Sequence, residues 1–148
     1  MAREGQGSSL RGNDLAERSA DWMDQAEGDL AHARSDLERG FYDWACFSTQ
    51  QSAEKAVKAV LYQMGLEVWG PCGADLLKVL AEHHAVPDSL REAALELDKA
   101  YIPTRYPDAL PAGSPRRRYT CREARRLVTY ADAILRFCQS VLSGFSPG

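Results

Sequence analysis

The chain has 148 residues, of which 45% are hydrophobic and 26% charged, and its formal net charge is −3 at neutral pH. This composition predicts one soluble globular domain and excludes a disordered chain, because enough apolar side chains are present to build a core. No apolar run approaches the length that a bilayer requires, so we expect no membrane partner. The four cysteines form no Cys-x-x-Cys pair, which favours reduced thiols and a cytoplasmic location.

The two ends of the chain are expected to lie outside the folded domain. Residues 1–18 begin with a small, polar, glycine-containing stretch that lacks the apolar segment of a secretory signal. We therefore expect a flexible N-terminal tail there. The single helical domain is expected over residues 19–144, followed by a short C-terminal tail over residues 145–148.

Helical periodicity dominates the first half of the chain. The first helix is expected over residues 19–39, where apolar residues recur at alternating steps of three and four, and Gly40 ends it. The second helix is expected over residues 42–64, with the same kind of apolar stripe and Gly65 as its end. The residues that follow contain glycine and proline and predict a loop.

The second half of the chain continues the helical pattern. A shorter helix rich in leucine comes first, and Ser89 with Glu92 then fits a capping box at the start of the next helix. Thr120 and Glu123 form a second candidate capping box before the last helix. No run alternates with the two-residue period of a strand. The sequence therefore predicts an all-α fold, an antiparallel up-and-down four-helix bundle with an additional short helix.

Residues 101–108 differ from an ordinary helix connection. Two prolines exclude helix there, yet the stretch also carries two tyrosines, an arginine and an aspartate. Seven arginines and two carboxylates lie between residues 103 and 126, a local net charge of +5, so the rest of the chain carries −8. We expect this region to meet a negatively charged molecule.

The side chains of this loop suit a nucleotide. Arg105 can bind a phosphate with two hydrogen bonds or stack on a base. Tyr101 and Tyr106 offer ring faces to a base, and Asp108 can accept from a ribose hydroxyl. A structural alternative remains open, in which Asp108 builds a turn and Arg105 pairs with Asp98 or Asp108.

Two further groups complete the candidate binding residues. Arg116, Arg117 and Arg118 would add diffuse attraction for a polyanion, although a solvated charge run before a helix is the alternative. Gln51 and Lys55 lie on or beside one face of the second helix. They offer hydrogen-bond donors at the edge of a groove, or they belong to a solvated polar stripe.

Motifs for metal binding and catalysis are missing from the sequence. A di-iron site in a bundle needs Glu-x-x-His pairs, which the chain lacks. The adjacent His83 and His84 have no further ligand at zinc spacing, and Cys72 has no base that the sequence places beside it. There is also no P-loop and no Gly-x-Gly-x-x-Gly motif. We expect no metal and no cofactor, and we assign no catalytic residue.

The order of residues from 19 to 143 resembles the HEPN domain family. The matching motifs are, in chain order, Gln50-Gln51, Glu54-Lys55-Ala56 and Arg105-Tyr106-Pro107-Asp108. The resemblance implies a fold similar to the helical substrate-binding domain of nucleotidyltransferases. It also implies a minimal nucleotidyltransferase as partner, in a two-component or toxin–antitoxin system, and a homodimer.

One branch of the HEPN family consists of metal-independent ribonucleases. Their motif places an arginine one to two helical turns before a histidine in the last main helix, and the final helix expected here contains no histidine. The resemblance therefore favours a non-enzymatic module that binds a nucleotide or RNA. The alternatives are a ribonuclease toxin with an atypical active site and a non-catalytic dimerisation or interaction domain.

Overall fold

A computed structural model of the chain describes residues 2–70, 72–101 and 112–145, with side chains from residue 14 onward. Among these residues there are six helices and no strand, which confirms the all-α prediction. The helices are, in chain order, α1 (Ala2–Arg39), α2 (Tyr42–Gln63), α3 (Gly73–Ala81), α4 (Asp88–Asp98), α5 (Pro115–Arg118) and α6 (Cys121–Ser143).

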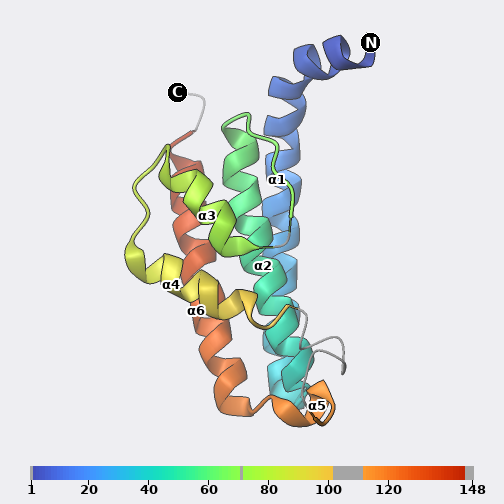
Figure 1. Ribbon diagram of the computed structural model, residues 1–148, viewed down its shortest axis with the longest axis vertical. Coiled ribbons are helices and arrows are strands. Elements are labelled where there is room, and N and C mark those ends of the chain that lie inside the picture. Colours follow the sequence, from blue (N-terminus) through green and yellow to red (C-terminus); the bar gives the residue numbers. More distant parts are fainter. Residues whose placement is uncertain (1, 71, 102–111, 146–148) are drawn as a thin grey trace.

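The helices form the expected bundle. The long helices α1, α2 and α6 lie side by side, and α1 and α2 run in opposite directions (Figure 1). The shorter helices α3 and α4 pack on one another, with α3 against α2 and α4 against both α2 and α6. The short helix α5 lies at the end of the bundle where α1 finishes and α2 begins (Figure 1). It is an additional helix that the sequence pattern did not predict.

Small residues and hydroxyl groups join α1 to α2. Ala26 and Ala33 of α1 are fully buried against α2, and small side chains at a contact let two helices approach closely. Ser19 Oγ donates to the carbonyl oxygen of Ala59 at 2.6 Å, and Ser52 Oγ donates to that of Ala26 at 2.7 Å. These bonds satisfy the polar side chains that the contact buries.

The helix ends agree in part with the expected ones. Gly40 and Gly65 both have φ +83°, a left-handed conformation that favours glycine, and they end α1 and α2 as predicted. The start of α1 differs, because the helix begins at Ala2 rather than near Ser19. The glycines of this segment weaken a helix by about 1 kcal/mol each but do not break it as proline does.

One of the two expected N-caps is present. Thr120 is the N-cap of α6, and its side chain accepts from the backbone N–H of Glu123 at 3.1 Å. The box predicted at Ser89 is wrong, because α4 begins earlier, at Asp88, with Pro87 as its N-cap and no side-chain cap. None of the helices in the described ranges is both long and apolar enough to cross a membrane.

Candidate functional site

The residues predicted to bind a ligand fall in three places. Arg105, Tyr106 and Asp108 lie outside the described residues, so their roles stay predictions. Tyr101 follows α4, and its ring lies against that of Phe47 on α2, with the ring centroids 6.0 Å apart and the planes 32° from parallel. Tyr101 therefore connects the end of α4 to the first turns of α2.

The polar stripe of α2 makes contacts inside the bundle. Lys55 Nζ lies 2.6 Å from Asp29 Oδ2 of α1, and only 20% of the lysine side chain is exposed. Gln51 Nε2 donates to Gln50 Oε1 at 2.8 Å and lies 3.5 Å from Glu54 Oε1. A ligand at this stripe would have to share these groups with their present partners, so binding by Gln51 and Lys55 stays a prediction.

An arginine cluster occupies one end of the bundle. It consists of the exposed residues Arg116, Arg117, Arg118, Arg122 and Arg125. Within the described parts of the chain none of the five forms an ion pair. Because α5 packs against α2 and is joined to α6 by two residues, their positive charges gather over a short distance (Figure 1). Such a concentration of one sign attracts anions.

An aromatic ridge lies at the same end of the bundle. It consists of Phe41, Trp44 and Phe47 at the start of α2, together with Tyr101. Phe41 is 47% exposed and Trp44 is 43% exposed. The rings of Trp44 and Phe47 meet edge to face, with centroids 6.4 Å apart and planes at 89°. Sequence reasoning missed this ridge, although the three-residue spacing of its α2 members was a visible signal, because buried helix faces show the same spacing.

Two tyrosines connect the arginine cluster to the start of α2. The side chain of Tyr42 forms a hydrogen bond with the Cys121 thiol, and this bond raises the pKa of Tyr42. The first turn of α6 therefore lies against the first turn of α2. Burial and the nearby Cys46 and Glu123 raise the pKa of Tyr119 to about 12. The Tyr119 phenol therefore stays protonated at neutral pH, and the end of α5 lies close to the first turns of α2.

Asp98 at the end of α4 joins three parts of the fold. Its carboxylate accepts from the backbone N–H groups of Gly73 and Ala74, both at 2.9 Å, and so caps α3. It also accepts from Cys72 Sγ at 3.0 Å and from Gln50 Nε2 of α2 at 3.3 Å. Since Tyr101 follows three residues later, these bonds also fix the point from which the proline-rich loop leaves.

The thiol of Cys72 is a poor nucleophile. Burial, followed by the hydrogen bond to Asp98, raises its pKa to about 11. The reactive form of a cysteine is the thiolate, and a catalytic cysteine has a lowered pKa. The environment of Cys72 therefore shifts the thiol away from catalysis.

Alkylation of Cys72 by iodoacetamide at pH 8 is expected to be roughly two orders of magnitude slower than that of an unstructured cysteine peptide with a pKa of about 8.5. The rate should rise about tenfold per pH unit up to a pH near 11, whereas the rate of the peptide levels off above its own pKa. Peptide mapping by mass spectrometry separates Cys72 from the other cysteines. Labelling as fast as that of the peptide at pH 8 would contradict the raised pKa.

A contact of Ser48, His32 and Asp36 also fails as a catalytic site. His32 Nδ1 lies 3.3 Å from Ser48 Oγ, and His32 Nε2 lies 3.4 Å from Asp36 Oδ2. Ser48, in the second turn of α2, is only 6% exposed, so its hydroxyl cannot reach a substrate. In the ranges that the structure covers, no group of three histidine, cysteine or acidic side chains suits a metal ion.

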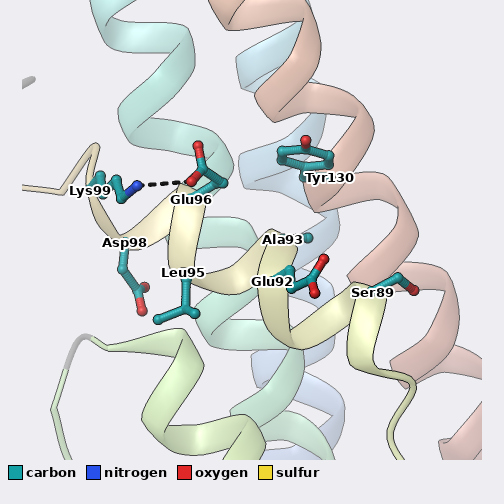
Figure 2. Close-up of a pocket in the computed structure, with 8 residues that line it drawn as sticks. All are labelled: Ser89, Glu92, Ala93, Leu95, Glu96, Asp98, Lys99 and Tyr130. Atoms are coloured by element: carbon teal, nitrogen blue, oxygen red, sulfur yellow. Dashed lines mark hydrogen bonds and ion pairs between the residues drawn. The ribbon is translucent and has the colours of Figure 1, made fainter.

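The outer face of α4 carries a hollow whose charge is opposite to that of the arginine cluster. Figure 2 shows the carboxylates of Glu92, Glu96 and Asp98 around it, with Lys99 bonded to Glu96 and Tyr130 contributed by α6. The three carboxylates outnumber the two cations paired with Glu96, Lys99 and Arg126, so this hollow repels a phosphate group. The arginine cluster with the aromatic ridge is therefore the better candidate site for an anion.

Comparison with known proteins identifies the class of this helical bundle. The model of the HEPN domain matches residues 19–141. The chain therefore belongs to the HEPN domain family, as its sequence motifs predict. No curated protein matches it.

Three solved structures are similar to this chain over nearly their whole length. TT1696 from Thermus thermophilus is 48% identical, with 84% of this chain and 98% of that chain covered and a TM-score of 0.82. A HEPN domain protein (tm0613) from Thermotoga maritima is 55% identical, with 82% and 97% covered and a TM-score of 0.69. ST0689, an archaeal HEPN homologue, is 40% identical, with 83% and 96% covered and a TM-score of 0.72.

Proposed function

We propose that the chain is a HEPN-type module that binds a nucleotide or RNA at the arginine cluster and does not cleave it. The observation that carries this proposal is the gathering of five exposed arginines that have no ion-pair partner among the described residues. Arginine suits phosphate because its planar guanidinium donates two parallel hydrogen bonds. The α4 face, with its three carboxylates, offers no comparable site.

Two further features support binding without cleavage. Tyr101 and the exposed rings of the aromatic ridge can stack on a base, which is a sequence-tolerant contact. The last helix, α6, contains no histidine to act as acid or base on a ribose 2′-hydroxyl, and Cys72 has a raised pKa. The alternative functions are a ribonuclease toxin with an atypical active site and a non-catalytic dimerisation or interaction domain.

The proposed partners are a minimal nucleotidyltransferase and a second copy of this chain. Membership of the HEPN family supports both, in a two-component or toxin–antitoxin arrangement. Co-expression with a minimal nucleotidyltransferase encoded beside this gene, followed by size-exclusion chromatography with light scattering, tests them. A stable complex is the expected result, and two proteins that elute separately would contradict it.

Titration of a fluorescently labelled RNA with the purified protein tests the binding function. We expect saturable binding that weakens as salt is raised, because phosphate contacts release counterions. Parallel titrations with ATP and GTP, followed by the fluorescence of tyrosine and tryptophan, compare RNA with mononucleotides. Absence of a saturable change with all three ligands would favour the interaction domain.

A further inference from the structure

One continuous surface runs from the outer face of α4 to the first turns of α6. The hollow on α4 includes Glu92 and Glu96 in its lining. A second hollow shares Glu96 with it and adds Arg126 of α6, and a third shares Arg126 and adds Arg122. Because each hollow shares a lining residue with the next, the surface from Glu92 to Arg122 is unbroken. We call it the α4–α6 face.

The charges in the middle of the α4–α6 face have partners within the chain. Glu96 lies 2.8 Å from Lys99 and 3.6 Å from Arg126. Tyr130, one turn after Arg126 on α6, and Leu95, which is 57% exposed, contribute apolar surface to the same region (Figure 2). A protein partner can therefore cover this region without burying an unpaired charge, which would be costly.

The two ends of the α4–α6 face carry charges of opposite sign. Glu92 at the α4 end is exposed and forms no ion pair among the residues that the structure describes. Arg122 at the α6 end belongs to the arginine cluster and is likewise unpaired there. The five cations of that cluster outnumber Glu123, the carboxylate that lines the same hollow as Arg122. One end of the face is therefore acidic and the other basic.

A face with these properties is complementary to a second copy of itself. In a two-fold symmetric contact, each residue meets a different residue of the other copy, and the same pair occurs twice. Two α4–α6 faces laid together in opposite directions bring Glu92 of one copy to Arg122 of the other at both ends. The regions with paired charges then meet in the middle. Complementary charge of this kind fixes the orientation of two proteins.

We propose that the α4–α6 face is the interface of a two-fold symmetric homodimer, in which Glu92 of each copy pairs with Arg122 of the other. This inference rests on the second copy named as a partner in the proposed function, and it assigns the surface that this partner contacts. The pairing uses one member of the arginine cluster and none of the three arginines of α5.

Charge reversal with rescue tests this interface, by sedimentation velocity over a series of protein concentrations at about 0.1 M salt. Glu92→Arg and Arg122→Glu should each raise the dissociation constant of the dimer at least about tenfold, because each reversal places like charges together at both symmetric contacts. The double variant Glu92→Arg/Arg122→Glu restores opposite charges. Its dissociation constant should return to within about threefold of the wild-type value.

The matched control is Asp24→Arg, which makes the same change of net charge at an exposed carboxylate of α1. Asp24 lies outside the α4–α6 face, so this variant is expected to dimerise as the wild type does. Circular dichroism of every variant checks that the helices are retained, which we expect because the three substituted residues are exposed.

The outcomes separate this inference from the proposed function. A wild type that is monomeric at every concentration overturns both the interface and the second copy as a partner. A dimeric wild type whose dissociation constant is unchanged in both single variants overturns the interface alone. Losses in the single variants that the double variant does not restore overturn the two-fold pairing. RNA binding is measured separately, so the binding function stands or fails on its own titrations.

Discussion

Replacement of Arg116, Arg117 and Arg118 together by alanine is expected to weaken binding of single-stranded RNA roughly 30- to 100-fold at about 0.1 M salt. For a single strand, each lost contact between a guanidinium and a phosphate lowers the slope of log affinity against log salt concentration by about 0.7. Loss of three contacts should therefore lower this slope by about 2. Anisotropy titrations of a labelled RNA at several salt concentrations measure both quantities.

A charge-matched control variant distinguishes binding at a localised site from a general effect of the protein's net charge. Arg18→Ala, Lys78→Ala and Arg91→Ala together remove the same charge from α1, α3 and α4, where all three residues are exposed. We expect this variant to lose no more than about threefold in affinity, because distant charges are screened. Equal losses in the two triple variants would contradict a localised site. The arginine variant should unfold at the wild-type temperature, since its residues are exposed.

Asp98→Ala is expected to destabilise the fold by about 2–4 kcal/mol, because the carboxylate accepts four hydrogen bonds. Its loss leaves the N–H groups of Gly73 and Ala74 without their cap and separates α3 from α4. For a chain of this size the melting temperature should fall by roughly 5–15 °C. Urea unfolding followed by circular dichroism measures the free energy.

Two variants test the origin of that loss. Asp98→Asn keeps one side-chain oxygen as acceptor and should cost less than alanine at the same position. Asp24→Ala removes an exposed carboxylate from α1 and should change stability by less than about 0.5 kcal/mol. If Asp98→Ala also changed the free energy of unfolding by less than about 0.5 kcal/mol, the Asp98 contacts would not hold α3 and α4 in place.

The fold was predictable because its helices obey local rules. Each signal affects only residues close to it in sequence. These signals are the apolar stripes, the glycines after α1 and α2, and the cap at Thr120. The start of α1 was predicted too late, since glycines and polar residues lower helix propensity without ending a helix. The start of α4 was also misplaced, because Ser89 is a preferred N-cap residue, whereas the observed N-cap, Pro87, has no side chain that can cap.

The candidate site was less predictable because it depends on tertiary contacts. The arginine run of α5 was visible in the sequence, but the approach of Arg122 and Arg125 follows from the turn between α5 and α6. The pairing of Lys55 with Asp29 joins residues 26 positions apart, and no local pattern predicts it. Exposure of Phe41 and Trp44 likewise depends on which neighbours cover α2.

The most direct test of binding without cleavage is a metal-free incubation of end-labelled single-stranded RNA with saturating protein, followed by a denaturing gel. We predict that the RNA is bound throughout and remains at full length, because α6 carries no histidine and Cys72 is protonated. Protein-dependent fragments that disappear in Arg122→Ala would contradict this account and favour a ribonuclease with an atypical active site.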